Sequence, residues 1–258
     1  MENKKNLIPI IVAVILIVVV AVVLGIGLMF KNNNRNINWA NENNLTSELD
    51  VKLKGSNLTL KSGNSYTAEG VSGDVTYTNE DSIMEIKESG SILSKTQNVV
   101  VNIPEKTKLR RANISTELGN VEIKDTLKAK KMKLEIGAGQ ANIADINTFD
   151  AIINVGAGKL KLDSGTITDL TFKLGIGEAE ITAKLLGLSE ITTGIGNLKL
   201  HLEGSIEDYK IEILKSTGEV FVSDKKCSKD EVIGNGENVI EIYCGAGEIK
   251  IDFTADND

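Results

Sequence analysis

Residues 134–143, LEIGAGQANI, contain the pattern that decides the fold. A Gly-x-Gly lies between two short stretches in which apolar and polar residues alternate, as they do in half-buried strands. In the first four copies the second glycines are spaced by 19 residues. The Gly-x-Gly occurs at Gly137/Gly139, Gly156/Gly158, Gly175/Gly177, Gly194/Gly196 and Gly245/Gly247, and single-glycine versions at Gly119 and Gly218 bring the total to seven rungs.

Alignment on the second glycine places apolar residues in columns. Five residues before it the column is Ile114, Leu134, Ile153, Phe172, Ile191, Ile213 and Ile242. Two residues after it the column is Val121, Ala141, Leu160, Ala179, Leu198, Val220 and Ile249. Such columns predict stacked core ladders.

The alternation within a rung slips by one residue at the glycine. Before it, the inward positions are expected at Leu134, Ile136 and Ala138, and after it at Ala141 and Ile143. A strand with this slip turns a corner, where glycine accepts a positive φ and lets successive backbones stack closely.

The repeat therefore predicts an all-β fold, a parallel β-solenoid with rungs of about 19 residues. A β-propeller has the same kind of periodicity, but its blades need about 40 residues each. Low aromatic content, 4% of the chain, agrees with a thin core built from Ile, Leu, Val and Ala.

The solenoid domain is expected over residues 49–258, with regular rungs at 114–253. Residues 49–113 are less regular and predict an N-terminal cap, as atypical end units usually do. Residues 223–238, SDKKCSKDEVIGNGEN, leave the register and predict an inserted surface loop.

The N-terminal region predicts a membrane anchor. Residues 7–30 carry no charge over 24 positions, long enough as a helix to cross a bilayer. A cleaved signal peptide would have a shorter apolar region and a small-residue cleavage site. We expect residues 1–6 to be a short cytoplasmic tail, 31–48 an Asn-rich linker, and the C-terminal domain to be extracytoplasmic at the cell membrane, on a slight positive-inside bias.

The charge distribution excludes nucleic acid as an expected partner. The chain has a net charge of −7, and residues 36–258 hold 25 basic and 35 acidic residues without a basic stripe. Nucleic-acid binding depends on clustered Lys and Arg.

These repeats resemble a bacterial putative-adhesin family of unknown function that often follows an N-terminal membrane anchor. The resemblance covers residues 49–253, including the strand VVVNIP at 99–104 and rungs such as ISTELGNVEI at 114–123. It implies an extracytoplasmic β-solenoid without known catalysis, and it supplies no functional residues.

The residues predict no catalytic, cofactor or metal site. His201 is the only histidine and is expected at the surface, without partners for a zinc site or a Ser-His pair. No helix follows the glycines, as dinucleotide binding would require. Glu178 and Glu180 have a spacing suited to paired carboxylates, but Lys161 and Lys199 on neighbouring rungs predict a Lys-Glu-Lys ladder around Glu180 instead.

Two residue pairs are candidates for a specific role. The outward aromatics Phe221 and Tyr243 either form a ligand patch or cover the inserted loop. Cys227 and Cys244 either close a disulfide that pins this loop to the last rung or remain two unpaired thiols, with Cys244 inward.

The sequence favours a membrane-anchored, non-catalytic surface module that acts as an adhesin-like binder or scaffold, with a wall polymer or an envelope protein as partner. One alternative is an envelope-stress sensor that works through a membrane partner. Another is a bactofilin-like polymerising scaffold, which the irregular cap and the polar C-terminal end disfavour.

Overall fold

The computed structural model describes residues 48–91 and 96–254. These residues are nearly all β, with one 3-10 turn, η1 (Ile206–Asp208). The strands are β1 (Glu48–Leu53), β2 (Asn57–Gly63), β3 (Thr67–Glu69), β4 (Val75–Glu80), β5 (Ile83–Glu88), β6 (Asn98–Pro104), β7 (Leu109–Thr116), β8 (Val121–Leu162), β9 (Gly165–Leu185), β10 (Leu188–Leu202), β11 (Tyr209–Ser216), β12 (Glu219–Val222), β13 (Lys225–Cys227), β14 (Val232–Ile233) and β15 (Asn238–Phe253).

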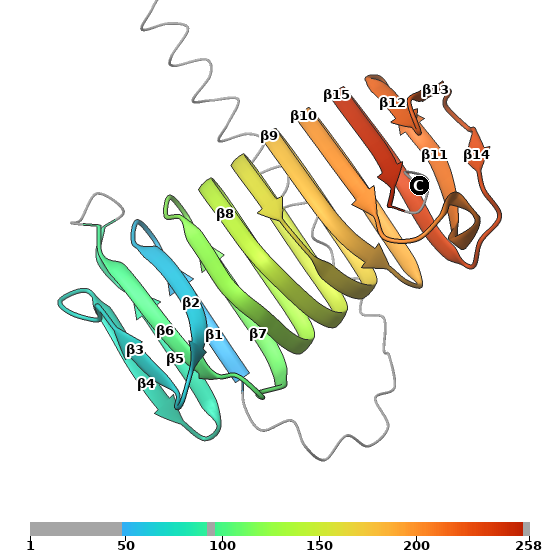
Figure 1. Ribbon diagram of the computed structural model, residues 1–258. Helices are drawn as coiled ribbons and strands as arrows, with labels where there is room; N and C mark the ends of the chain where they lie inside the picture. The colour runs from blue at the N-terminus through green and yellow to red at the C-terminus, as the bar shows by residue number, and fades with distance from the viewer. Residues whose placement is uncertain (1–47, 92–95, 255–258) are drawn as a thin grey trace, which may run out of the picture. The chain divides into compact units, whose positions relative to one another are not determined.

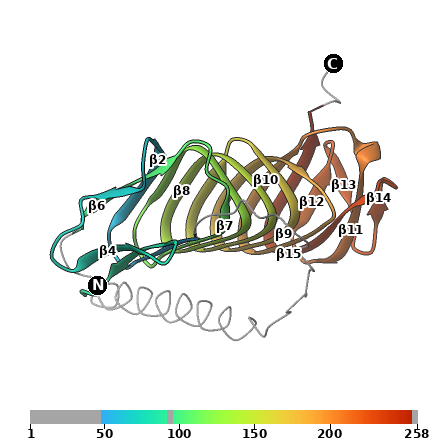
Figure 2. The ribbon, with the colours of Figure 1, turned by 90° about the horizontal axis from the view of Figure 1, so that it is seen from below.

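Long parallel strands stack rung on rung in the middle of the domain (Figures 1 and 2). Gly158 of β8 lies beside Gly177 of β9, and Gly177 lies beside Gly196 of β10, so the 19-residue spacing is the register. The column five residues before the glycine is buried at every rung, with Phe172 between Ile153 and Ile191. The predicted all-β class and the stacked apolar ladders are confirmed, in a solenoid-like arrangement.

The corner glycines are required by close backbone approach. Gly158 has a φ of 156°, and a Cβ added to it would lie 1.9 Å from the carbonyl oxygen of Gly139 on the preceding rung. No side chain fits at that distance, so the corner admits only glycine.

The rungs do not stack in chain order at either end. β15, the last strand, lies between β10 and the β11–β12 rung, since Gly196 pairs with Gly247 and Val220 pairs with Ile249. At the other end β1 lies between β7 and β5. A reading in chain order, with the rung of Gly247 last, is therefore wrong: the rung of Gly218 is the outer one.

Short antiparallel strands pair with both outer rungs. At the N-terminal end β4 pairs with β5 and β3 pairs with β6. At the C-terminal end β13 pairs with β12 and β14 pairs with β11. The predicted inserted loop at 223–238 thus contains two short strands, β13 and β14. Short edge strands of this kind leave little unpaired backbone for another chain to join.

The predicted tail (1–6), the anchor (7–30) and all but the last residue of the linker (31–48) lie outside the described residues, and Glu48 is the first residue of β1. Within 48–91 and 96–254 no helix is long and apolar enough to cross a membrane.

Candidate functional site

A polar trough with a volume of about 390 Å³ runs across β8, β9, β10 and β15. Its floor is formed by the buried Leu160, Ala179 and Leu198. Its walls are the outward residues one and three places after each corner glycine. We call these residues the polar trough: Gln140, Asn142, Lys159, Lys161, Glu178, Glu180, Asn197, Lys199 and Glu248.

Amide side chains fix one wall of the trough to the backbone. Asn120 Oδ1 accepts the Gln140 N–H at 3.0 Å, and Asn197 Oδ1 accepts the Glu248 N–H at 3.2 Å. Each bond joins the same position on neighbouring rungs, immediately after the corner. The spacing between successive residues of this wall is therefore the spacing of the stacked rungs.

The charged groups of the trough have charged partners inside and outside it. Lys159 Nζ lies 2.8 Å from Glu178 Oε2, and the hydrogen bond from Lys159 lowers the pKa of the exposed Glu178 carboxyl. Glu180 lies between Lys161 and Lys199 in the strand register, as the predicted ladder requires. The Lys161 ammonium, however, hydrogen-bonds Asp163, the residue that follows the end of β8, and this bond raises the pKa of Lys161.

An apolar row runs along the corner beside the trough. It is formed by the residue immediately before the second glycine of each rung, and in this column Ile195 is 57% exposed and Leu118 49% exposed. The expectation that Ala138 points inward belongs to this column: Ala138 and Ile176 are only partly buried, and Leu118 and Ile195 face solvent. In a Gly-x-Gly the two glycines let the backbone turn, and the residue between them lies at the apex of the turn. We call this column the apolar ridge: Leu118, Ala138, Ala157, Ile176, Ile195 and Ala246.

The register makes the apolar ridge continuous. Ile176 lies beside Ala157 on one strand and Ile195 on the other, and Ile195 lies beside Ala246. Further along, the stacking of Gly139 on Gly119 and of Gly158 on Gly139 carries the row through Ala138 to Leu118.

Comparison with known proteins assigns the fold to a family. The family described as Toastrack DUF4097 matches residues 27–252. The chain belongs to this family. No curated protein matches its sequence.

The solved structures that resemble this Toastrack chain are of proteins distant from it in sequence. A putative cell adhesion protein from Clostridium sporogenes is 16% identical, with 82% of this chain and 95% of that chain covered and a TM-score of 0.37. A putative adhesin from Bacteroides fragilis is 11% identical, with 81% and 93% covered and a TM-score of 0.44. Another, from Parabacteroides merdae, is 16% identical, with 81% and 92% covered and a TM-score of 0.40.

The register of this Toastrack domain does not bring Phe221 and Tyr243 side by side. Phe221 follows its corner glycine and lies next to Lys250, whose Nζ is 5.8 Å from the ring centroid. Tyr243 precedes its corner glycine and lies next to Thr192. Burial and the nearby Glu241 and Glu190 raise the pKa of Tyr243.

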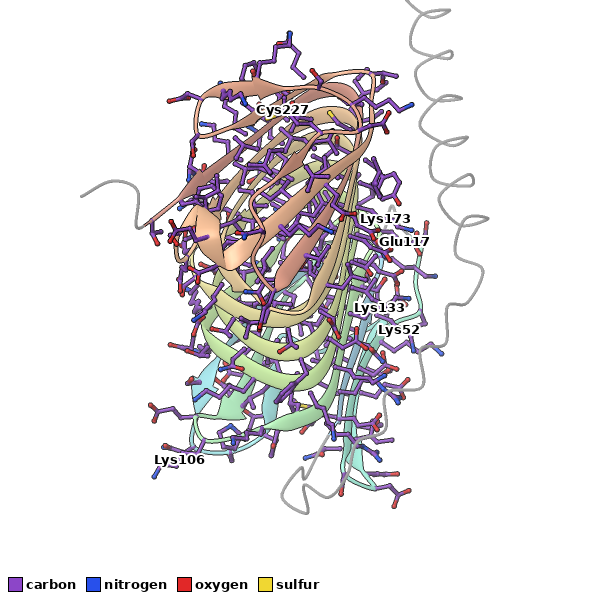
Figure 3. All side chains as sticks on the ribbon, turned by 90° about the vertical axis from the view of Figure 1, so that its right-hand side faces the viewer. Lys52, Lys106, Glu117, Lys133, Lys173 and Cys227 are labelled. Carbon is purple, nitrogen blue, oxygen red and sulfur yellow. The ribbon has the colours of Figure 1, made fainter. Side chains whose placement is uncertain are left out.

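The two thiols are free and buried. Cys227 pairs with Val220 at the end of the domain, where Figure 3 shows it. Burial and the nearby Glu231 raise the pKa of the Cys227 thiol. Cys244 lies on the inner strand β15, with its Sγ 3.8 Å from the Glu219 carbonyl oxygen. The disulfide is not formed in this structure, and thiol labelling decides between the clip and two unpaired thiols.

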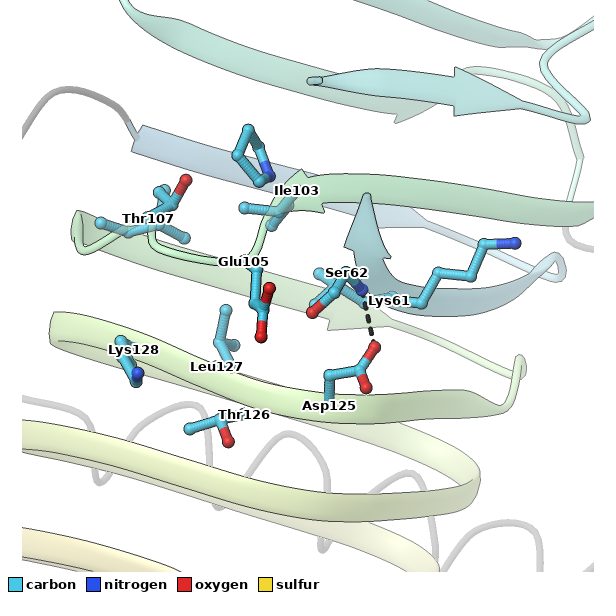
Figure 4. A pocket seen from close by; sticks show the side chains of 12 residues that line it. Lys61, Ser62, Ile103, Glu105, Thr107, Asp125, Thr126, Leu127 and Lys128 are labelled. Carbon is cyan, nitrogen blue, oxygen red and sulfur yellow. Dashed lines mark hydrogen bonds between the residues drawn. The ribbon is translucent and has the colours of Figure 1, made fainter. Parts of the chain in front are cut away.

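Other candidate groups have local partners. His201 is partly exposed, with Nδ1 3.9 Å from Asp252 Oδ2. A second hollow, near the N-terminal cap, measures about 20 Å³, room for a single water molecule. There Asp125 accepts the Ser62 N–H at 2.7 Å (Figure 4). In the described ranges no three His, Cys, Asp or Glu side chains are placed to hold a metal ion.

Sequence reasoning missed one buried carboxylate. Glu88 is 4% exposed, and its Oε2 accepts the N–H groups of Lys54, Gly55 and Ser56 at 2.6, 3.0 and 3.2 Å. Elsewhere corner N–H groups bond to carbonyls of the neighbouring rung, as Ala138 does to Glu117. The chain leaves the outer rung after β5, so a carboxylate takes the place of those carbonyls. In the sequence, the one sign of this role is that Glu88 lies at the end of a predicted strand.

Proposed function

We propose that the chain is a membrane-anchored, non-catalytic surface module that binds an extracytoplasmic partner through the polar trough, as an adhesin or scaffold does. The observation that carries the proposal is the alternation of amide, ammonium and carboxylate groups along the trough, held at fixed spacing by stacked rungs. A rigid display of donors and acceptors needs little ordering when a ligand binds.

The state of the carboxylates favours binding over acid–base chemistry. A general acid needs a raised pKa, usually from burial. Glu178 is exposed, its pKa is lowered by Lys159, and Glu180 stands between two lysines in the register.

The geometry favours an extended polar ligand. The trough crosses successive rungs, which lie about 4.8 Å apart, so a chain-like ligand laid along it would meet a donor or acceptor at regular intervals. Its lysines and glutamates balance, which suits a polymer carrying hydroxyl, amide and mixed charged groups. A wall polymer has this chemistry, and residues 7–30 would hold the domain close to it.

Co-sedimentation with purified, insoluble cell-wall polymer tests the proposal. The full-length chain in mild detergent should sediment with the polymer. The variant Lys161→Ala with Lys199→Ala should lose most of this binding, because both side chains are exposed in the trough.

A matched control removes two lysines elsewhere. Lys52→Ala with Lys133→Ala removes the same number of positive charges as the trough variant, at two lysines outside the trough that Figure 3 labels. The control variant should sediment like the unmodified chain. If both double variants lost the same amount of binding, the loss would reflect net charge and not the trough. If the unmodified chain did not sediment with the polymer, wall-polymer binding would be refuted.

A further inference from the structure

We propose that the domain pairs with a second copy of itself through the apolar ridge, with the two ridges antiparallel. The ridge is a continuous row of apolar residues in which Leu118, Ile195 and Ala246 are exposed, and the column immediately after the corner glycine carries charged and amide side chains. Exposed apolar rows with polar borders mark interaction surfaces. The pairing does not depend on binding in the trough, although the column that borders the ridge is also one wall of the trough.

The sizes of the ridge residues are self-complementary in the antiparallel arrangement. A two-fold axis between the rungs of Ala157 and Ile176 sets each bulky residue against an alanine. Both ridges have the same rung spacing, so the match holds along the whole row. Facing pairs are Leu118 with the partner's Ala246, Ala138 with the partner's Ile195, and Ala157 with the partner's Ile176.

A parallel arrangement lacks this fit. It would place Ile176 against the partner's Ile176 and Ile195 against the partner's Ile195, while the alanines faced each other across gaps. An isologous interface uses the same surface on both subunits, so self-complementarity is the property it requires.

Charges beside the ridge match in the same arrangement. The column immediately after the corner glycine faces its own copy in reverse order. Lys159 then faces the partner's Glu178, and Glu178 faces the partner's Lys159. Between the rungs of Gln140 and Asn197, amide faces amide. No like charges meet along this border, and complementary charges fix register.

The contact is narrow, so the pairing should be weak. Six residues on neighbouring rungs span about 24 Å, one side chain wide, well under the roughly 800 Å² per partner of a standard interface. Confinement raises effective concentration without adding contacts. If the chain is anchored as proposed, confinement to a membrane would supply this.

Site-specific cross-linking of the full-length chain in mild detergent, at high protein concentration, tests the register. Leu118→Cys and Ala246→Cys chains carrying different tags are mixed and oxidised. The antiparallel arrangement predicts a mixed disulfide dimer between the two variants, and little dimer from either variant alone. The unmodified chain, with both native thiols buried, sets the background.

Other patterns contradict the proposal. Dimer from Leu118→Cys alone and Ala246→Cys alone would indicate parallel ridges. Background levels in all mixtures would rule out pairing through the ridge.

A second set of variants separates pairing from folding. Adding Ile176→Asp and Ile195→Asp to both cysteine chains should abolish the mixed dimer with little change in the melting temperature, because Ile195 is 57% exposed and Ile176 is only partly buried. The control Val232→Asp removes an equally exposed apolar residue, 54% exposed, in β14 and should leave the dimer intact. Persistence of the mixed dimer in the Ile176→Asp, Ile195→Asp chains would overturn the proposal, whatever wall-polymer binding shows.

Discussion

Glu88 binds Ser56 through both oxygens of its carboxylate: Oε1 accepts the Ser56 hydroxyl at 3.0 Å, and Oε2 accepts the Ser56 N–H at 3.2 Å. This contact joins the end of β5 to the corner between β1 and β2, across 32 residues of sequence. It closes the backbone hydrogen bonding of the rung next to the N-terminal end.

Glu88→Gln should destabilise the domain by about 1–3 kcal/mol, because a neutral amide oxygen accepts the three backbone N–H groups less strongly than a carboxylate oxygen, and the NH₂ replaces the oxygen that accepts the Ser56 hydroxyl. Chemical denaturation at pH 7 measures this change. Glu85→Gln, on the same strand with a less buried side chain, is the control and should change stability little. Equal effects of the two changes would contradict the role given to Glu88.

The same carboxylate should make stability depend on acid. Burial raises the pKa of Glu88, but the hydrogen bonds from Lys54, Gly55 and Ser56 outweigh it and hold the pKa below its ordinary value of 4.5. A carboxyl whose pKa is lowered by folding stabilises the folded state above that ordinary value, and the stabilisation is lost as the pH falls through the folded pKa. Melting temperatures between pH 6 and pH 3 should fall less steeply in Glu88→Gln than in the unmodified chain.

Gly158→Val should destabilise the domain by well over about 1 kcal/mol, whereas Lys159→Ala beside it should have a small effect. The valine Cβ would meet the Gly139 carbonyl oxygen at 1.9 Å, and Lys159 is exposed. Melting temperatures of the two variants decide the matter. Similar values would refute the corner assignment.

The columns were predictable from sequence, but the order of the rungs was not. Ile153, Phe172 and Ile191 could be aligned because every rung repeats the same inward position. For the same reason Ile242 fits equally well beside Ile191 or beyond Ile213, so the pattern cannot place β15. The error at Ala138 has another cause: strand alternation does not continue through a residue held between two glycines.

Glu241→Gln should stabilise the domain by a few tenths of a kcal/mol. In the register Glu241 lies between Glu190 and Glu212, and like charges side by side on neighbouring strands are destabilising. The gain should shrink in 1 M salt, which screens the repulsion. Glu237→Gln, just before β15 and outside this column, removes one charge as a control. A gain of the same size there would point to net charge instead.

Both cysteines should resist a maleimide reagent in the folded chain and react once it is denatured, because both side chains are buried and the pKa of the Cys227 thiol is raised. Mass spectrometry counts the labels. Two labels per denatured, unreduced chain are expected. None, with the chain monomeric, would establish the disulfide between Cys227 and Cys244 instead.

Protease added to intact cells should remove the β domain if residues 7–30 anchor it on the outer side. An antibody to a C-terminal tag follows the loss, and a cytoplasmic protein serves as the control for cell integrity. Full protection in cells whose envelope admits the protease would reverse the proposed topology.

The place of β15 governs how the domain is completed during synthesis. The ribosome delivers β11 and β12 before the strand that separates them from β10. Until residues 238–253 emerge, β10 presents an unpaired edge whose inward positions match those of β11 as well as those of β15. In a nascent chain halted before residue 238, β11 can therefore pair directly with β10, in the place that β15 occupies in the finished domain. The 16 residues of β15 must take up that place before the outer rung can pack in its final position.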